Sequence, residues 1–435
     1  MYPLYTVSFF LLALVTLPWW LWQYVRGPKY RGTVRQRLGG APSDWPPDPP
    51  DGPPPCFWLH AVSVGEAVAA RDLARRLVER LPGLRLMVST VTRTGRDEVL
   101  RTYPFAHGHF YLPLDLPGVV DRVLDRARPR CLVVMETELW PNLFRAAARR
   151  GIPVVVANGR LSPPSFRNYR RVRWAMARFL APVRLFCMQS AADADRMTTL
   201  LGGADPRVMV TGNIKYDQAL RLPDAAEMTE LDRRLGPRAG PLWVAASTHR
   251  GEEEPLLAAF RALTAGHPAL RLVLVPRHPE RAREVAGFCR AAGWDWQFLG
   301  ELDRGWSAPV LIVDQVGWLR RFYGLADLVF VGGSFIPHGG QNILEPAAWG
   351  RPPLHGPHMF NFREAERQLR EAEASLPLAG PHELAAAGRR LLDDPALARA
   401  MGERARQVVA ANTGALERTL AATLAALPAA DGGDR

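Results

Sequence analysis

The sequence is poor in cysteine and lacks the common metal and nucleotide motifs. Its 435 residues contain four cysteines, which lie far apart in apolar surroundings without a CxxC pair: Cys56, Cys131, Cys187 and Cys289. Such cysteines are typical of core thiols in a cytoplasm-facing protein, not of disulfides or a metal site. No HExxH motif or Cys/His cluster indicates a metal, and there is no Walker lysine loop or nucleophile elbow.

Acidic residues are also fewer than basic ones. The 55 lysines and arginines outnumber the 43 acidic residues, so the net charge is +12. This balance favours an anionic partner, which could be nucleic acid, a membrane surface or a phosphorylated substrate. Nucleic acid is the weakest of the three, because the arginines are spread along many segments and no helix-turn-helix, zinc finger or aromatic RNA-binding motif occurs. The length allows two or three domains at ~150 residues each.

The longest apolar segment lies at the N-terminus, from Leu4 to Val25. About 20 such residues suffice to cross a bilayer. Aromatic residues gather at the distal end of this segment, and basic residues follow directly. We therefore expect an uncleaved anchor with the rest of the chain on the cytoplasmic face of the inner (plasma) membrane. A cleaved signal peptide fits poorly, because no positive region precedes the apolar run. A monotopic helix lying in the membrane interface remains an alternative.

Beyond the anchor, short β-type runs alternate with helical patterns in two series. The predicted strands are Cys56–Ala61, Arg85–Thr90, His109–Leu112, Cys131–Glu136, Pro153–Ala157, Leu185–Gln189 and Arg207–Thr211, then Leu242–Ala246, Arg271–Pro276, Pro309–Val313 and Leu328–Val331. Two βα series predict two doubly wound domains with a cleft between the carboxyl edges of their sheets. The expected organisation is an anchor and basic segment (1–40), a proline-rich linker (41–55), a first domain (56–216), an interdomain linker (217–240), a second domain (241–410) and a terminal helix with tail (411–435).

A glycine-rich stretch follows the last predicted strand, from Val331 to Gly350 (VGGSFIPHGGQNILEPAAWG). Glycine lets the backbone approach a ligand, and Asn342 could cap a new helix whose N-terminus favours an anion. Strand, glycine loop and helix start together predict a phosphate or sugar site. An ordinary strand-to-helix turn is the alternative.

Carboxylates follow two strands of the first domain. Glu66 begins a helix directly after the first strand, and the helix dipole would favour its ionised form. Glu136 and Glu138 come at the end of another buried strand, where charged groups need partners or a task. Arg160, after the next strand, could neutralise them. For Glu66, simple capping of the helix is about as probable as a catalytic function.

Basic groups gather at the second domain. Lys215 lies near the predicted hinge, and Ser247, Thr248 and His249 follow the first strand of the second domain. Arg277, His278 and Arg281 follow its next strand. Two arginines and a histidine framed by prolines suit a phosphate better than solvation alone.

Seven motifs in order resemble those of one family, the Kdo transferases, which move 3-deoxy-D-manno-octulosonate (Kdo) from CMP onto the lipid A precursor of lipopolysaccharide. They are HAVSVGE, ETELWPN, NGRLS, GNIKYD, ASTHRGEE, VPRHPER and GGSFIPHGGQNILEPAAWG, and the resemblance covers nearly the whole chain. It implies an α/β GT-B fold, with two Rossmann-like domains facing a central cleft, and an inverting glycosyltransferase that needs no metal or other cofactor. The implied partners are CMP-Kdo, a phosphorylated lipid A precursor (lipid IVA) and the inner membrane, with no nucleic acid.

The resemblance also assigns residues. Glu66 matches the general base, and Glu136 and Lys215 match positions that support the transition state. The positions that match CMP-binding ones are Arg277, His278, Val316, Gly317, Trp318, Asn342, Ile343, Leu344 and Glu345. The family usually has an acidic residue at the position of Trp318, so only a backbone contact is expected there.

Two other functions fit the same residues. One is a GT-B enzyme that uses a UDP-sugar, and the other is a membrane-tethered binder of anionic lipid or nucleotide without turnover.

Overall fold

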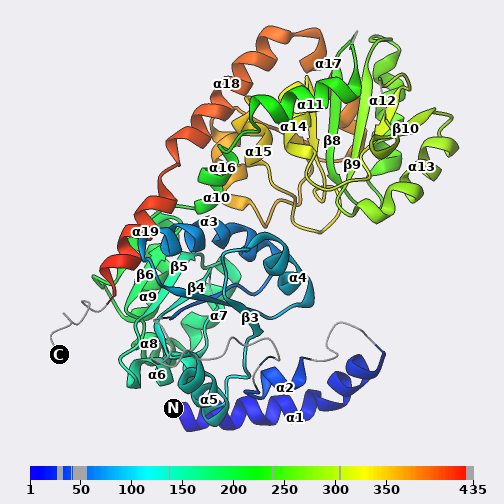
Figure 1. Ribbon diagram of the computed structural model, residues 1–435. Coiled ribbons are helices and arrows are strands. Elements are labelled where there is room, and N and C mark those ends of the chain that lie inside the picture. The colour runs from blue at the N-terminus through cyan, green and yellow to red at the C-terminus, as the bar shows by residue number, and fades with distance from the viewer. Residues whose placement is uncertain are drawn as a thin grey trace. The chain divides into compact units, whose positions relative to one another are not determined.

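The computed structural model describes residues 1–26, 33–40, 42, 56–136, 138–237, 240–302 and 305–427 (Figure 1). The chain divides into two compact units: Met1–Ile214 with Thr413–Arg435, and Lys215–Asn412. Most of the predicted proline-rich linker (41–55) and the end of the predicted tail lie outside the described residues. The stretch predicted as an interdomain linker (217–240) contains the second half of helix α10 and all of α11, and it belongs to the second unit.

The first unit is a parallel seven-stranded sheet with helices on both faces, in the strand order β3-β2-β1-β4-β5-β6-β7. Its strands are β1 (Cys56–His60), β2 (Arg85–Thr90), β3 (Gly108–Tyr111), β4 (Pro129–Met135), β5 (Val154–Gly159), β6 (Leu185–Met188) and β7 (Val208–Val210). Its helices are α1 (Tyr2–Arg26), α2 (Val34–Arg37), α3 (Val64–Arg80), α4 (Arg93–Thr102), α5 (Pro117–Ala127), α6 (Pro141–Arg149), α7 (Pro163–Arg171), α8 (Arg173–Leu180), α9 (Ala191–Leu201) and α19 (Ala415–Ala425).

The central strands of this sheet are apolar on both faces because helices cover both. In β1, Trp58 points into one buried cluster, whereas Phe57 and Leu59 point into the other. Every residue of β1 is buried. A continuous apolar run of this kind is what a parallel sheet between two helix layers requires.

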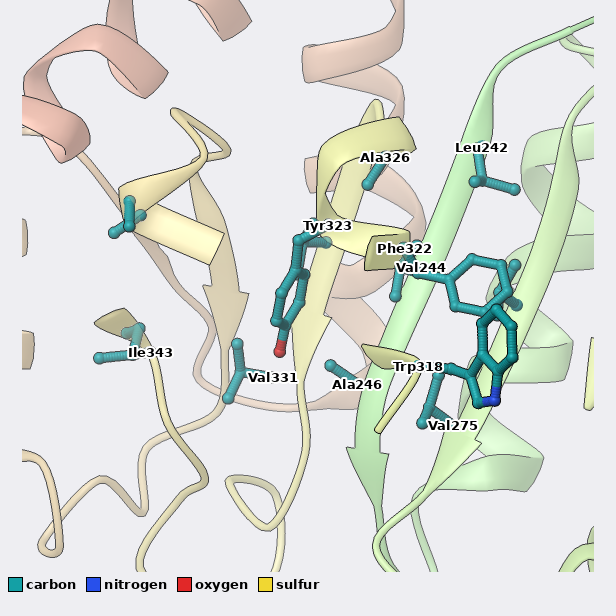
Figure 2. Packing of buried hydrophobic residues seen from close by; sticks show 14 of the residues in the cluster. Leu242, Val244, Ala246, Val275, Trp318, Phe322, Tyr323, Ala326, Val331 and Ile343 are labelled. Atoms are coloured by element: carbon teal, nitrogen blue, oxygen red, sulfur yellow. The ribbon is translucent and has the colours of Figure 1, made fainter. Parts of the chain in front are cut away.

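The second unit repeats this plan, with the strand order β10-β11-β9-β8-β12-β13-β14. Its strands are β8 (Leu242–Thr248), β9 (Arg271–Pro276), β10 (Trp296–Phe298), β11 (Val310–Ile312), β12 (Leu328–Val331), β13 (Pro353–His355) and β14 (Leu376–Pro377). Its helices are α10 (Ile214–Ala219, whose first residue belongs to the first unit), α11 (Ala225–Leu235), α12 (Glu253–Thr264), α13 (Ala282–Ala291), α14 (Leu319–Leu325), α15 (Leu344–Ala348), α16 (Arg363–Glu371), α17 (Leu384–Asp393) and α18 (Pro395–Ala411), with short 3-10 turns at Pro279–Arg281, Leu299–Glu301 and Pro381–Glu383. Figure 2 shows part of its core, where Trp318 and Phe322 from the α14 region pack towards the sheet beside Val275.

All eleven predicted strands are present, and three more were not predicted: β10, β13 and β14. These strands are only two or three residues long, and β13 begins with a proline, so they carry no period-2 pattern to read. Their hydrogen bonds to neighbouring strands, not their own sequence, make them strands.

The N-terminal segment forms a helix as predicted, but the prediction of a transmembrane span is not supported. Among the described helices, none combines the length and apolar character needed to cross a membrane. One face of α1 instead carries polar groups bonded to the first unit. The Tyr5 hydroxyl donates to Asp115 Oδ2 at 2.9 Å, and Thr6 exchanges hydrogen bonds with Asn142.

Candidate active site

The carboxyl edge of the first sheet brings together the carboxylates that the sequence singled out. Strands β1 and β4 are neighbours, and the chain order reverses between them. In open parallel sheets this reversal opens a crevice where ligands bind. Glu66 follows β1, and Glu136 follows β4. Together with Glu138 and Arg160, both side chains line a pocket of about 240 Å³.

Glu66 is held by the start of helix α3. Ser63 is the N-cap, and its hydroxyl accepts from the backbone N–H of Glu66. The Glu66 carboxylate accepts in turn from the N–H of Val62 at 2.8 Å and from the Ser63 hydroxyl at 3.2 Å. Glu66 is therefore a capping residue that also faces the pocket, so the two alternatives weighed from the sequence do not exclude one another.

Burial and neighbouring negative charges raise the pKa of carboxyl groups in this pocket. Burial, then the charge of Glu136, raises the pKa of Glu66 to about 7, against the hydrogen bonds from Val62 and Ser63, and Glu138 adds to the rise. Burial and Glu136 likewise raise the pKa of Glu138 to about 7. Whatever the helix dipole contributes in favour of the ionised form, desolvation and two neighbouring carboxylates outweigh it, and the pKa of Glu66 is raised.

Two residues at the strand ends hold uncommon backbone conformations. Glu136 has φ +55° and Asn158 has φ +53°, a region that non-glycine residues seldom occupy and that is enriched at functional sites. Arg160 lies two residues beyond Asn158, and its guanidinium is 3.9 Å from the Glu136 carboxylate. The predicted neutralising contact is therefore present.

The far wall of this pocket includes two residues of the NGRLS motif, Leu161 and Ser162, and two that the sequence did not single out, Ser165 and Tyr169. Leu161, Ser162, Ser165 and Tyr169 line it from the turn after β5 and from α7. Burial, with the charge of Glu138, raises the pKa of the Tyr169 hydroxyl. Ser162 caps α7 by accepting from the N–H of Ser165.

In the second unit the strand order reverses between β8 and β12. His249 follows β8, and its ring lies 4.5 Å from that of His338 and 6.2 Å from that of His278. Its Nε2 is 3.1 Å from Gln341. Burial, then the histidines and the nearby Arg277, lowers the pKa of His249 to about 4. The predicted basic residues thus surround one neutral imidazole.

The glycine loop after β12 was predicted to form a phosphate or sugar site, and three of its backbone N–H groups already have a partner within the protein. Glu252 is fully buried, and its carboxylate accepts from the N–H groups of residues 333, 334 and 335 at 2.8 to 3.1 Å, and from His249 N–H. Burial raises the pKa of Glu252, and these four bonds oppose the rise. The protein's own carboxylate therefore occupies the loop amides that were expected to hold a ligand.

The glycines themselves are required by the protein. A Cβ at Gly332 would collide with the Ser247 backbone, and one at Gly340, where φ is +74°, would collide with Met359. The close approach that the glycines allow is thus to other segments of the second unit.

The remaining residues predicted to bind CMP lie in two places, the start of α15 and the loop before α14. Asn342 was predicted to cap α15, but the N-cap of this helix is Ile343, which makes no side-chain capping bond; Asn342, one residue earlier, accepts from the N–H of Leu344. Ile343 and Leu344 are fully buried, so only their backbone can meet a ligand. Burial raises the pKa of Glu345, opposed by Arg320 and Asn342.

In the loop before α14, Val316 is 70% exposed and Gly317 has φ +94°. Trp318 is buried, and its ring lies beneath the guanidinium groups of Arg234 and Arg321. Its indole N–H donates to Gln315. The Trp318 side chain is thus part of the core, which leaves only its backbone for a ligand contact.

Lys215 opens the second unit. Its Nζ lies 5.6 Å from the centre of the Phe362 ring, at the start of α16. Next to it, the Tyr216 hydroxyl donates to Gln368 on the same helix at 2.8 Å. Glu66 and Glu136 belong to the other unit.

Comparison with known proteins places the chain in a family. A family model described as 3-deoxy-D-manno-octulosonic-acid transferase (kdotransferase) matches residues 32–218. A 3-deoxy-D-manno-octulosonic acid transferase of Haemophilus influenzae is 37% identical over 91% of this chain and 92% of that relative. One of Bordetella pertussis is 36% identical over 96% of this chain and 97% of that relative.

The solved structure of a UDP-GlcNAc 2-epimerase from Neisseria meningitidis, bound to UDP-GlcNAc, covers 85% of this chain and 100% of its own, with a TM-score of 0.58 and 14% identity. This likeness concerns the fold alone, and with the two parallel sheets it confirms a GT-B-like α/β architecture. The two relatives are more than 35% identical to this chain over at least nine-tenths of their length, which shows the family as well as the fold. The chain belongs to the family of 3-deoxy-D-manno-octulosonic acid transferases, which are glycosyltransferases.

Proposed function

We propose that this Kdo transferase takes Kdo from CMP-Kdo and transfers it, with inversion, to a phosphorylated lipid A precursor such as lipid IVA. The observation that carries the proposal is Glu66, a pocket carboxylate with a pKa of about 7. A carboxylate with this pKa can take a proton near neutrality and is poised as a general base.

In the proposed reaction a hydroxyl oxygen of the acceptor bonds to the ketosidic carbon of Kdo. The bond between that carbon and the CMP phosphate oxygen breaks, and its electron pair leaves with CMP. Glu66 takes the hydroxyl proton. Glu136 and Lys215 would support the cation-like sugar and the charge moving from it. Such charged groups, held in place by the protein, stabilise the transition state more strongly than a hydrogen bond in water would.

The second unit is proposed to hold CMP. Arg277 and His278 lie near His249 after the carboxyl end of β8, and they suit a phosphate that gains negative charge as the sugar leaves. The backbone of residues 316–318 and the start of α15 at residues 342–345 would contact the rest of the nucleotide. The reaction as proposed uses no metal, so a chelator should leave the rate unchanged.

We also propose that the protein acts at the inner membrane, on its cytoplasmic face, with α1 lying along the membrane surface. One side of α1 bonds to the first unit, and apolar side chains on its other sides are more than half exposed: Leu4, Val7, Phe10, Leu11, Leu12, Leu14 and Val15. On α8, which contacts Tyr2 of α1, Trp174 is 63% exposed beside arginines. An apolar helix face with basic and aromatic neighbours suits an anionic lipid surface.

The test is a purified-enzyme assay in detergent with CMP-Kdo and lipid IVA. Release of CMP together with a lipid product heavier by Kdo supports the proposal. Binding of both compounds without CMP release would support the non-catalytic binder, and turnover with a UDP-sugar alone would support the other glycosyltransferase.

A further inference from the structure

A second pocket in the second unit is not used by the proposed reaction. Strand β13 ends at His355, and residues 356–362 lead from it into α16. Between this loop, α16 and β14 lies an open pocket of about 420 Å³. Its charged and imidazole lining groups are His355, His358, Arg363, Glu366 and Arg370.

His355 is one of the residues that line this pocket, and Nε2 of its ring, itself buried, is unsatisfied. The residue is 1% exposed, and its Nδ1 lies 2.9 Å from the carbonyl oxygen of Gly356. A carbonyl only accepts, so Nδ1 carries the proton and Nε2 of the neutral ring is an acceptor. Burial lowers the pKa of His355, which favours that neutral ring. Nε2 has no hydrogen-bond partner within the described chain, a costly state that a ligand hydroxyl would relieve.

Positive groups flank this acceptor. Arg363 is exposed, and it has no hydrogen-bond or ion-pair partner among the residues that the structure describes. It is the first residue of α16, whose N-terminus has no side-chain cap, so the helix dipole adds to its charge. Arg370, two turns along the helix, lies 3.0 Å from Glu366. Guanidinium groups match carboxylates and phosphates in geometry, and Glu366 can accept further hydroxyls.

The loop that forms the pocket wall is bonded to the candidate donor site. Ser334 of the glycine loop accepts through its hydroxyl from Gly356 N–H at 2.9 Å and through its carbonyl from His358 N–H at 3.0 Å. Phe362, between the lining residues Phe360 and Arg363, has its ring centre 5.6 Å from Lys215 Nζ. A ligand in this pocket would therefore lie close to the groups that are proposed to act on the donor.

We propose that this pocket binds the oxyanion of a sugar that takes part in the transfer, with Arg363 holding the oxyanion and His355 Nε2 accepting a sugar hydroxyl. The oxyanion is either the carboxylate of the donor sugar acid or a phosphate of the acceptor. This inference rests on the proposed function and assigns a binding site to one of its substrates.

The kinetic test compares R363Q with R367Q in the full chain. Arg367 is on the same helix, outside the pocket, and pairs with Glu364 and Glu371, so it is a matched control. We expect R363Q to raise one KM about tenfold or more, and R367Q to change neither. A rise for phosphorylated but not dephosphorylated acceptor identifies the phosphate, and a rise for CMP-Kdo identifies the carboxylate. No difference between the two variants overturns the proposal.

A binding measurement separates the pocket from the reaction. Inorganic phosphate and acetate are titrated calorimetrically into the full chain with saturating CMP, which fills the donor phosphate site. Binding of either anion by wild type and R367Q, weakened about tenfold or more in R363Q, supports the pocket even if no Kdo is transferred. Equal binding by all three proteins, or none by wild type, contradicts it whatever the transferase assay shows.

Discussion

The Glu66 carboxylate caps the start of α3 and also lines the pocket with Glu136 and Glu138. A substitution that keeps the capping bonds therefore tests its catalytic role without removing its role in folding. We predict that E66Q, which keeps both the shape and the capping oxygen, lowers kcat by about 10²- to 10⁴-fold, the usual share of a general base. The measurement is the initial rate of CMP release, with the thermal transition as a control for folding. Turnover within a few-fold of wild type would remove Glu66 from the base role.

The pH dependence follows from the same carboxylates. A base must be ionised, and the pKa of Glu66 is raised from 4.5 to about 7, so kcat/KM should rise with pH through about 7. In E138Q one like charge is gone, which favours the ionised form of Glu66, and the rise should move to lower pH. An unchanged or higher midpoint in that variant would contradict this reading.

The raised pKa has the opposite effect on stability. Burial penalises the ionised Glu66, so its contribution to folding is fully favourable below about 4.5 and is lost as pH rises through about 7. The pH optimum of activity and the pH of greatest stability of this site should therefore differ.

Glu252 allows a stability prediction in the second unit. We predict that E252Q lowers the free energy of unfolding by about 2–4 kcal/mol, since the amide keeps one acceptor oxygen where a carboxylate served four buried N–H groups. Chemical denaturation measures the change. Its matched control is E254Q, at an exposed glutamate of α12, which should unfold like wild type.

At the scale of elements, the sequence predicted well which residues meet at a sheet edge, and it predicted poorly which distant segments contact one another. Glu66, Glu136 and Arg160 follow parallel strands, and the ends of such strands meet at one edge, so their meeting was foreseeable from the strand pattern. The hydrogen bonds between Glu252 and the glycine loop could not be foreseen, because they join the start of α12 to a loop some eighty residues away. Strand β13 was missed because three residues behind a proline carry no pattern, and the pocket beside it was missed with it.

Helix α1 carries the prediction for membrane binding. The double substitution L11S/V15S removes two exposed apolar side chains without touching the bonds to Asp115 and Asn142. We expect it to weaken binding to anionic vesicles about 10- to 100-fold, the loss of roughly 1.5–3 kcal/mol of apolar burial. Vesicle co-sedimentation measures this, and V210S, at an exposed apolar residue of strand β7, is the control. Equal binding by all three proteins would exclude α1 as the contact.

At the scale of the whole molecule, the scarcity of lysine was a signal that the motif reading left unused. Of the 55 basic residues only Lys29 and Lys215 are lysines. Where arginine supplies nearly all positive charge, a lysine inside a motif points to a need for a compact ammonium group that a guanidinium does not meet.

Whether the protein binds CMP or UDP should be measurable as a rise in the Tm of the second unit. A ligand at 100 times its Kd adds about 2.7 kcal/mol to the state that binds it. For a unit the size of residues 215–412 this corresponds to a rise in Tm of about 5–10 °C. We predict that CMP produces this rise in calorimetry and that UDP at the same concentration does not. If the two units unfold separately, only one transition should move. In R277Q the shift should be lost, whereas R283Q, at an exposed arginine of α13, should keep it. A shift with UDP but not CMP would reverse the donor assignment, because the preference lies in the base and the phosphate cluster is common to both nucleotides.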